Sequence, residues 1–369
     1  SRRYRERENH ISSDSWPIYI SLQKDGILFK MRRTQDLPDK ESATMFFQDC
    51  KLSHQAQITG ISHSVKEILP PDLLDLTQLQ KEANIRYGYT ASEVYDIAQS
   101  LYEKKLISYP RTSSRYLTED VFDSLPPIMA RLLSWELFPA AKGTGGIDIS
   151  SLSRHVISAE KANVHHAIII TGIRPGNMSE KEMQVYRLVA GRMLETFMAP
   201  CRIETTNVEA VCGAQHFKAE QTRIIEAGWH DVFMRSDMIP TSGYSVKELP
   251  EVEKGDTLNV CGCNMVHKKQ LPVNPFTDAE LVEYMELNGL GTVSSRTNII
   301  RTLVNRKYIR YSGRYIIPTP KGMFTYETIR GKKIADTLLT ADWEKQLAGL
   351  ESGMITGQDF LNRIRTLAK

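Results

Sequence analysis

The spacing of apolar residues changes from the two-residue period of strands to the longer period of helices and back, which constrains the fold more than any other feature. Strand-like patterns occupy residues 17–69 and 201–275, whereas residues 70–200 and 276–369 have mostly helical patterns. A helical insertion of domain size therefore interrupts a strand-rich segment, and we predict one discontinuous strand-rich domain around it. The predicted fold class is multidomain α+β.

The first strand-rich segment begins with a hairpin pattern. Ile18, Ile20 and Leu22 alternate with other residues, and the pair Asp25 and Gly26 follows where a tight turn is expected. The same alternation recurs in the stretches CRIETTNVEAVCGAQHFKAE and DTLNVCGCNMVHK. These patterns predict antiparallel strands, although they do not say which distant strands pair.

Capping boxes mark the starts of several helices. In this signal a Ser or Thr is followed three residues later by Glu, ahead of an apolar stripe. The three pairs are Thr90 with Glu93, Ser179 with Glu182, and Thr277 with Glu280. We predict a helix after each pair, and a further one over LTEDVFDSLPPIMARLL that its two prolines interrupt.

The C-terminal segment has the order helix, turn, helix, hairpin. The second of these helices is expected over SSRTNIIRTLVNRKYI with Ser294 or Ser295 as its N-cap, and the hairpin turns at Ser312 and Gly313. Arginines lie on the second helix and on the strands. This order is typical of winged-helix-like nucleic-acid-binding modules.

Composition places the chain among proteins of a reducing compartment. Its five cysteines are scattered over 369 residues, so they do not form a disulfide framework. No apolar run is long enough to cross a bilayer, and the basic N-terminal stretch SRRYRERENH is not followed by the apolar core of a secretory signal. We therefore expect a cytoplasmic, nucleoid-associated protein without a membrane partner.

Positive charge is concentrated near the C-terminus. The net charge is only +3, but the interval from Arg296 to Lys333 contains ten Lys or Arg residues and a single acid, Glu327. Such an interval can contact a phosphate backbone. The alternative is an ordinary solvated surface.

The stretch LISYPRTSSRYL contains a candidate nucleophile. Tyrosine is a weak nucleophile at neutral pH because its phenol titrates near pH 10, so Tyr109 would need help from a neighbouring cation. Arg111 has the planar fork that suits two phosphate oxygens, and Pro110 ends the preceding helix. The alternative is a tyrosine that only packs in the core.

Two further motifs could carry chemistry. His165 and His166 precede an apolar strand-like run, and as neighbours on an extended chain they point in opposite directions, which argues against one shared metal. Cys261 and Cys263, with His267 nearby, make a weak zinc signal. The sequence has no D-x-D, P-loop or G-x-G-x-x-G motif, so we predict no metal ligands in this chain.

Taken together these segments resemble the type IA DNA topoisomerases, and within them the topoisomerase III group. The resemblance covers most of the chain. It rests on LLDLTQLQKEANIRYGYTASEVYDIAQSLYEKKLISYPRTSSRYL, HHAIIITG, YRLVAGRMLETFMAP, EAGWHDVF and FTDAELVEYMELNGLGTVSSRTNIIRTLVNRKYI, which follow in the family's order. Three positions depart from the family pattern: Ser113 replaces an Asp, and Ile170 and Val293 each replace a Pro.

The resemblance implies a transesterification without ATP. Tyr109 would attack a phosphodiester of single-stranded DNA and keep the 5′-phosphate as a phosphotyrosine, so that the break can be resealed after another strand has passed. Arg111 matches the family's active-site arginine, and His165 matches its active-site histidine. Ser113, Thr292, Ser295 and Arg296 stand at or beside the family's DNA-contacting positions.

The family's torus implies a domain arrangement. Residues 70–200 would carry the tyrosine, while residues 17–69 and 201–275 would form the arch. Residues 276–369, packed with an N-terminal helix in residues 1–16, would bind the single strand. Whether the protein mainly relaxes negative supercoils or decatenates DNA stays open.

The family's chains also contain an N-terminal Toprim domain that binds Mg²⁺ through a glutamate and a D-x-D motif. Because this sequence has no such segment, we expect a core fragment that binds DNA but does not cleave it alone, with Mg²⁺ held by the missing domain. The alternative function is a non-enzymatic winged-helix-like DNA-binding protein. A relaxase is less favoured, because the chain has no His-x-His metal site.

Overall fold

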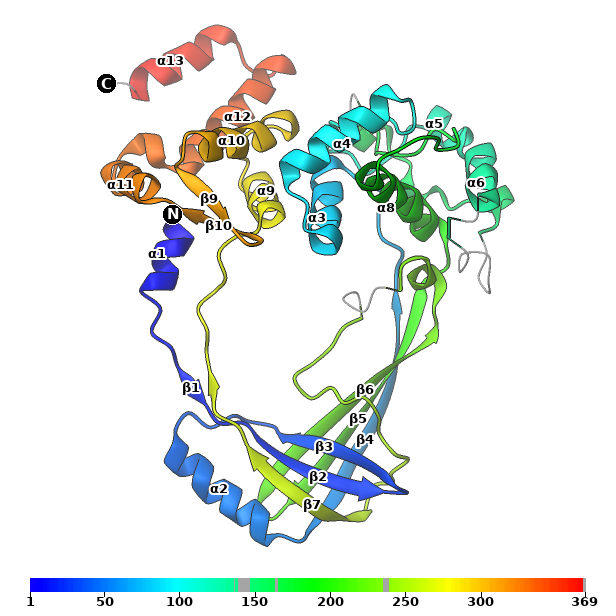
Figure 1. Ribbon diagram of the computed structural model, residues 1–369, viewed down its shortest axis with the longest axis vertical. Helices are drawn as coiled ribbons and strands as arrows, with labels where there is room; N and C mark the ends of the chain where they lie inside the picture. The colour runs from blue at the N-terminus through cyan, green and yellow to red at the C-terminus, as the bar shows by residue number, and fades with distance from the viewer. Residues whose placement is uncertain (136, 139–146, 163–164, 235–238, 368–369) are drawn as a thin grey trace.

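The computed structural model describes residues 1–135, 137–138, 147–162, 165–234 and 239–367. Its backbone forms a ring around a central opening, with a β-barrel at one end and two groups of helices at the other (Figure 1). The architecture is multidomain α+β, as the sequence predicts, while the division into four domains stays a prediction. None of the helices within the described residues is long and apolar enough to cross a membrane.

Six strands close the barrel in the order β2-β3-β6-β5-β4-β7. They are β2 (Ile18–Lys24), β3 (Ile27–Arg33), β4 (Gln55–Ile68), β5 (Cys201–Cys212), β6 (Gln215–Glu226) and β7 (Thr257–Met265). The predicted hairpin of β2 and β3 is confirmed, with Asp25 and Gly26 in the turn at φ 51° and 82°. Alternate apolar residues fill the barrel, and α2 (Lys40–Leu52) packs against β2 and β7 at one end.

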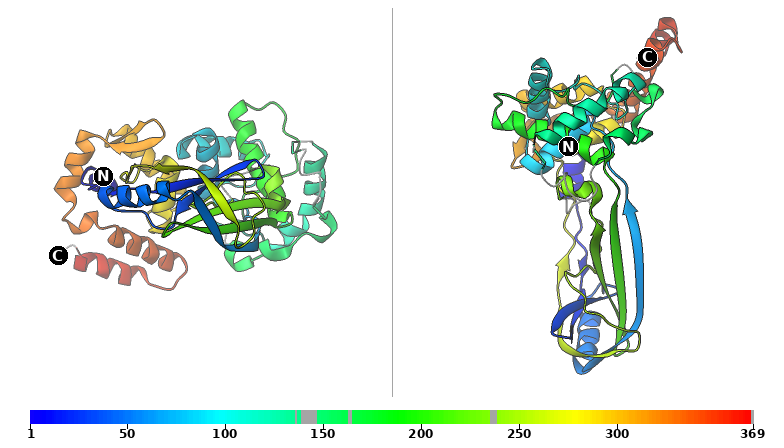
Figure 2. Two further views of the ribbon diagram at one scale, coloured as in Figure 1. Left: turned by 90° about the horizontal axis from the view of Figure 1, so that it is seen from below. Right: turned by 90° about the vertical axis from the view of Figure 1, so that its right-hand side faces the viewer.

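Three of these strands extend beyond the barrel as a ribbon. The β4–β5 pairing runs as far as Ile68 opposite Cys201, and β5 stays paired with β6 as far as Glu226. The outer half of β4 has no buried residue, so solvent reaches both of its faces there. The ribbon links the barrel to the first group of helices (Figure 2).

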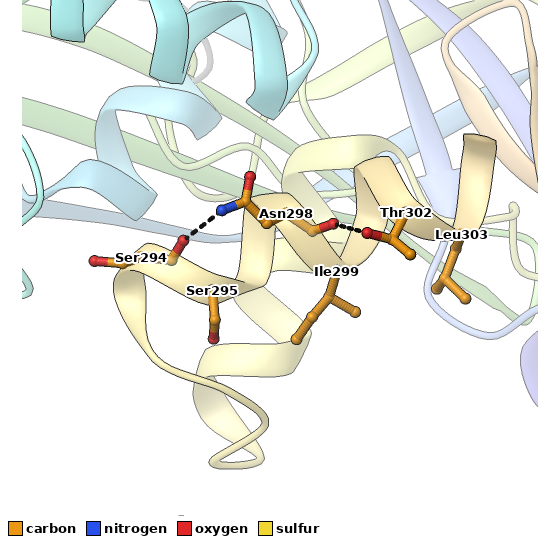
Figure 3. A pocket seen from close by; sticks show the side chains of 6 residues that line it. All are labelled: Ser294, Ser295, Asn298, Ile299, Thr302 and Leu303. Atoms are coloured by element: carbon orange, nitrogen blue, oxygen red, sulfur yellow. Dashed lines mark hydrogen bonds between the residues drawn. The ribbon is translucent and has the colours of Figure 1, made fainter. Parts of the chain in front are cut away.

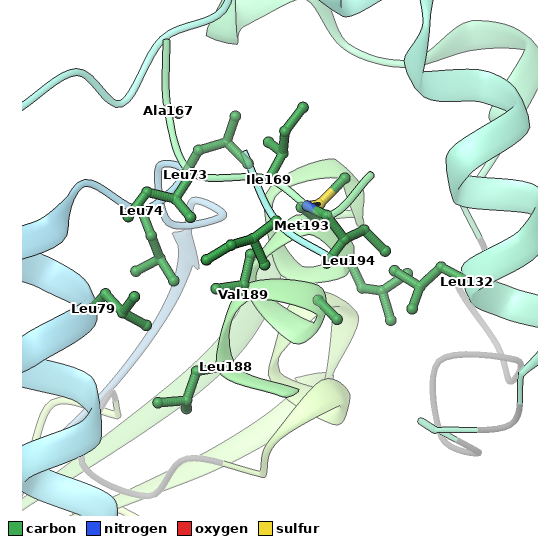
Figure 4. Close-up of a cluster of buried hydrophobic side chains, with 14 of the residues drawn as sticks. Leu73, Leu74, Leu79, Leu132, Ala167, Ile169, Leu188, Val189, Met193 and Leu194 are labelled. Atoms are coloured by element: carbon green, nitrogen blue, oxygen red, sulfur yellow. Dashed lines mark hydrogen bonds between the residues drawn. The ribbon is translucent and has the colours of Figure 1, made fainter. Parts of the chain in front are cut away.

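That first group, the helical insertion, packs around α8 (Glu180–Phe197). The other members are α3 (Leu76–Tyr87), α4 (Ala91–Glu103), α5 (Glu119–Asp123), α6 (Leu125–Ser134), α7 (Ala159–Ala162) and the short turns η2 (Ile149–Ser151), η3 (Arg154–Val156) and η4 (Gly228–Val232). The capping boxes predicted for α4 and α8 are both present. Figure 4 shows how leucines of several elements meet Val189 and Met193 of α8.

The second group of helices begins with α9 (Asp278–Leu287), which has its predicted capping box, and α10 (Val293–Asn305). The hairpin of β9 (Ile309–Ser312) and β10 (Tyr315–Pro318) follows, then α11 (Pro320–Ile329), η6 (Lys333–Ala335), α12 (Thr337–Glu351) and α13 (Gly357–Leu367). The N-terminal helix α1 (Arg2–Glu8) joins this group, since Arg5 pairs with Glu327 and Arg3 lies 3.9 Å from the ring centre of Phe276.

The expected N-cap of α10 was wrong. Thr292 caps the helix, because its backbone N–H donates to Ser295 Oγ at 2.8 Å and its carbonyl accepts from Arg296 N at 3.1 Å. Ser295 occupies the place that Glu takes in the usual capping box, so the sequence lacks the usual signal.

Two extended segments connect the barrel to the second group of helices. They pair only where β1 (Asp14–Ser15) meets β8 (Lys268–Lys269). The ring is then completed by a non-covalent contact, which we call the seam: α3 and α4 on one side, α9 and α10 on the other (Figure 1).

The seam has a small apolar centre and a polar surround. Its buried apolar residues are Ala91, Val282, Met285, Ile300 and Ile316. The carboxylate of Asp278 accepts hydrogen bonds from the Ala91 N–H at the start of α4 and, at 3.0 Å, from the Tyr311 hydroxyl.

Further polar contacts cross the seam. Gln80 Nε2 donates to Thr297 Oγ1 at 3.0 Å, and the ion pairs Lys81–Glu283 and Arg301–Asp96 measure 2.7 and 2.8 Å.

Candidate active site

Tyr109 lies on a loop that follows α4. The loop is fixed by strand-like hydrogen bonds to the apolar run after the two histidines: Ser108 N donates to the Ile169 carbonyl at 2.8 Å, and Ser108 Oγ donates to the Ala167 carbonyl at 3.1 Å. Thr112 Oγ1 adds a bond to the His165 carbonyl at 2.9 Å. The tyrosine loop and the histidine segment are therefore held together as one unit.

The ring of Tyr109 lies between two other aromatic rings. Its centre is 4.5 Å from that of His165 and 5.3 Å from that of Tyr102, which meets it nearly edge-on. Tyr109 is half-buried, whereas His165 and Tyr102 are exposed. This arrangement restricts the orientation of the tyrosine ring and leaves its surroundings open to a ligand.

Arg111 rests on α4. Its Nη2 donates to Gln99 Oε1 at 3.3 Å, and its guanidinium carbon lies 5.0 Å from the ring centre of Tyr95. Its Nε is buried and has no hydrogen-bond partner within the described part of the chain. No acid pairs with Arg111 in the described ion pairs, so its charge is available to an anion.

The neighbouring candidates differ in their surroundings. Nδ1 of His166 lies 2.7 Å from the Ala167 carbonyl, while the ring of His165 stacks on the tyrosine. Ser113 is exposed on the same loop as Tyr109. The structure thus brings Tyr109, Arg111 and His165 together, with Ser113 beside them.

A buried ion pair supports the loop from below. Arg115 Nε lies 2.7 Å from Asp75 Oδ2, and the other oxygen of Asp75 caps α3 by accepting from Gln78 N at 2.7 Å. Burial raises the pKa of Asp75, while the bond from Gln78 and the charge of Arg115 oppose that rise. This pair ties the tyrosine loop to α3, one of the seam helices.

The residues present do not form a metal site. Nowhere in the described ranges do three His, Cys, Asp or Glu side chains gather in a way that could hold a metal ion. Cys261 is exposed and its Sγ lies 3.7 Å from the Asn259 carbonyl, with no second ligand set around it. No step of the chemistry below is therefore derived through a metal.

The second set of candidates lies across the seam at the start of α10. Thr292 and Ser295 are bonded to each other, and Arg296 is buried, with its guanidinium 3.3 Å from both Glu286 Oε1 and the Leu290 carbonyl. Val293 packs against the core of the helical insertion. These residues hold the N-terminus of α10 against the part of the chain that carries the tyrosine.

One face of α10 borders an open hollow of about 510 Å³. Its lining residues are Ser294, Ser295, Asn298, Ile299, Thr302 and Leu303 (Figure 3). Hydroxyl and amide groups alternate there with aliphatic ones, a mixture that suits sugars and bases better than phosphate.

Most of the C-terminal basic residues are exposed. Two are used within the structure, since Arg296 pairs with Glu286 and Arg301 with Asp96. The exposed ones are Arg306, Lys307, Arg310, Arg314, Lys321, Arg330, Lys332 and Lys333. They leave a positively charged surface available to a phosphate backbone.

Sequence reasoning missed the contribution of α4. Tyr95, Gln99 and Tyr102 are spaced four and three residues apart, so they form one stripe on the face of α4 that contacts Arg111 and Tyr109. This spacing was visible in the sequence. Its meaning was not, because polar and aromatic residues at helical spacing more often form a solvated face.

Comparisons with known proteins agree with this geometry. A family model described as DNA topoisomerase matches residues 1–362. DNA topoisomerase 3 of Bacillus licheniformis is 31% identical over 338 residues, which are 85% of this chain and 46% of that protein. DNA topoisomerase 3 of Shouchella clausii is 30% identical over 382 residues, 95% of this chain and 51% of that protein.

A solved structure shares the ring. Full-length topoisomerase I from Thermotoga maritima superimposes with a TM-score of 0.75 at 23% identity, covering 99% of this chain and 60% of that one. The chain spans about half the length of the curated relatives it matches. The family match over nearly the whole sequence, the topoisomerase 3 relatives and the shared ring fold together show that the chain belongs to the type IA DNA topoisomerase family and is similar to topoisomerase III.

Proposed function

We propose that this chain forms the strand-breaking core of a type IA topoisomerase that cuts, passes and rejoins single-stranded DNA through a 5′-phosphotyrosine intermediate. The observation that carries the proposal is the packing of Tyr109 between His165 and Tyr102, with Arg111 on the same loop. A tyrosine kept only for core packing would not need exposed rings on two sides and a cation without an acidic partner beside it.

In the proposed reaction the Tyr109 hydroxyl oxygen attacks a backbone phosphorus and the bond from phosphorus to the 3′-oxygen breaks. The phenol proton is lost and the departing 3′-oxygen takes up a proton, so one phosphodiester replaces another and no ATP is consumed. Arg111 would offer its guanidinium N–H groups to the phosphate oxygens as charge develops. His165 would orient the tyrosine ring and donate to the same phosphate.

The family resemblance implies Mg²⁺ as a cofactor. We propose that Mg²⁺ is held by a Toprim domain of the same polypeptide, because the described residues of this chain gather no ligand set and Ser113 stands where the family has an acid. When bound, a metal of this kind supplies positive charge to the reacting phosphate. The residues of this chain would bind and orient the strand.

Passage of a second strand requires the ring to open, and the seam is the non-covalent contact that completes it. We propose that the single strand runs along the α10 face towards Tyr109 and that separation of the seam admits the passing strand. The result would be relaxation of negative supercoils or decatenation, in the cytoplasm and close to the nucleoid.

Strand preference separates this proposal from its alternative, a winged-helix-like protein that only binds duplex DNA. Binding of a single-stranded oligonucleotide and of the matching duplex should be compared at one salt concentration, because both affinities fall steeply with salt. We expect tighter binding to the single strand. Equal or tighter duplex binding would favour the alternative.

Covalent trapping tests the nucleophile. The polypeptide as its gene encodes it, treated with Mg²⁺ and a labelled single strand, should give an SDS-resistant adduct that Tyr109→Phe abolishes while strand binding persists. The 369-residue chain by itself should give no adduct. An adduct that survives in Tyr109→Phe would overturn the assignment.

A further inference from the structure

Three of the five cysteines meet at the end of the barrel that α2 covers. Cys50 lies in the last turn of α2, Cys212 is the last residue of β5, and Cys263 lies on β7. All three belong to the barrel's apolar cluster, and Cys212 Sγ lies 3.9 Å from the Cys50 carbonyl oxygen. The side chain of Cys50 is hydrogen-bonded to both other thiols, so it lies between them.

The three thiols differ in access and in acidity. Cys50 and Cys212 have no exposed surface, whereas Cys263 is only half-buried, so solvent reaches this member of the group. The hydrogen bond with Cys50 lowers the pKa of Cys263, with a smaller contribution from the charge of Lys51, and the same bond raises the pKa of Cys50. An accessible thiolate therefore sits against a protonated thiol, as in peroxide-sensitive cysteine pairs.

We propose that Cys263 and Cys50 form a peroxide-oxidisable pair, in which Cys263 is attacked first and Cys50 resolves the product into a disulfide. The sulfur of Cys263 attacks one peroxide oxygen, the O–O bond breaks, and the other oxygen leaves as water, which gives a sulfenic acid. The sulfur of Cys50 then attacks the sulfenic sulfur, and the hydroxyl leaves as a second water. Two thiols are oxidised and one peroxide is reduced.

The bond would join two elements that are now held only by packing. It would fasten the end of α2 to β7, the strand that leads into β8 and one of the two extended connections. A cross-link between positions this far apart in the sequence also restricts the unfolded chain. The inference concerns the barrel alone and does not depend on the proposed DNA chemistry.

Thiol counting with mass spectrometry tests the proposal on the wild-type chain. The folded protein is treated with hydrogen peroxide at a few equivalents, then denatured and alkylated. We expect the number of alkylated cysteines to fall from five to three, a mass loss of about 2 Da before alkylation, and a linked peptide pair containing Cys50 and Cys263. Five free thiols, or oxidation of Cys261 without a linked pair, would overturn it.

Single substitutions assign the roles. Cys263→Ser should prevent peroxide-dependent linking, and Cys50→Ser should leave a sulfenic acid on Cys263 that dimedone captures. Cys261→Ser is the matched control, because this exposed thiol lies two residues away on the same strand and should not affect the link. Linking of Cys50 to Cys212 while Cys263 stays free would contradict the proposed order of attack.

Discussion

At the scale of single residues, the structure gives Tyr109 a fixed ring and open surroundings at the same time. A phenol that must meet a phosphorus in line needs its ring held, since rotation about the side-chain bonds would carry the oxygen away from the phosphorus. The rings of Tyr102 and His165 provide that restraint. Because both are exposed, a strand could reach Tyr109 without first displacing core residues.

Arg111 and Arg296 show what residue type alone does not reveal. Both arginines follow from the sequence as candidates, but Arg111 rests on a ring and an amide while Arg296 is buried against Glu286. An arginine in an ion pair and one without an acidic partner have the same letter in a sequence. Their partners come from α4 and α9, so only the fold separates the two environments.

A backbone requirement gives the first prediction. Gly228 has φ +51°, and a Cβ there would lie 2.3 Å from the Ala199 carbonyl oxygen and 2.4 Å from that of Pro200. We expect Gly228→Ala to lower the free energy of unfolding by at least about 3 kcal/mol, through both strain and collision. Chemical denaturation measures this.

Gly88 provides the matched control. It has φ +72°, but a Cβ there would meet nothing within 4 Å. Gly88→Ala should therefore cost only the backbone strain, about 1–2 kcal/mol. Equal losses in the two variants would mean that the contact with the carbonyls has no energetic weight.

At the scale of elements, local signals were reliable and distant pairings were not. The hairpin turn at Asp25 and Gly26 and the capping boxes of α4, α8 and α9 are formed by residues within a few positions of one another, so they were predictable and are confirmed. Closure of the barrel pairs β2 with β7, more than two hundred residues away in the sequence. No local pattern specifies such a pairing, because many strands have compatible faces.

One capping residue also joins two helices, which gives a pH prediction. Glu182 caps α8 and reaches α4, where it accepts from Ser100 Oγ at 2.7 Å and pairs with Lys104 Nζ at 2.6 Å. The bond from Lys104, followed by those from Ser100 and Ser179, lowers the pKa of Glu182 from 4.5 to about 2. Stability from the carboxylate is therefore present above about pH 4.5 and is lost as the pH falls towards 2.

We expect Glu182→Gln to lower the free energy of unfolding by about 1–2 kcal/mol at pH 7, because the amide keeps the cap but not the charge. The difference from wild type should shrink between pH 4.5 and the acid limit of folding. Denaturation at pH 7, 5 and 3.5, with Glu180→Gln as an exposed control in the same turn, checks this. A difference that stays constant with pH would show that the charge is not responsible.

At the scale of the whole molecule, the seam is the part of the ring that can open without unfolding an element. Its ion pairs are partly exposed and contribute little, whereas Asp278 is buried and holds two donors from different elements. Asp278→Ala leaves the Ala91 N–H and the Tyr311 hydroxyl without their acceptor. We expect this to weaken the seam by about 2–4 kcal/mol.

Hydrogen exchange measures the effect where it should occur. In Asp278→Ala the first amides of α4 and α9 should exchange about tenfold or more faster, while amides of the barrel strands are unchanged. Tyr311→Phe, which removes one of the two donors, should have a smaller effect in the same place. Faster exchange throughout the chain would indicate general destabilisation and would count against the seam as a separate contact.

The single non-covalent contact in the ring has a mechanical consequence for a ligand without ends. A circular DNA strand that has entered the opening is threaded like a bead on a closed wire, so weakening its ionic contacts does not release it. It must wait for the seam to part, whereas a linear strand of the same sequence slides out. Protein loaded onto circular single-stranded DNA should therefore survive a wash at about 1 M salt, where charge screening is nearly complete, and cutting the circle should release it.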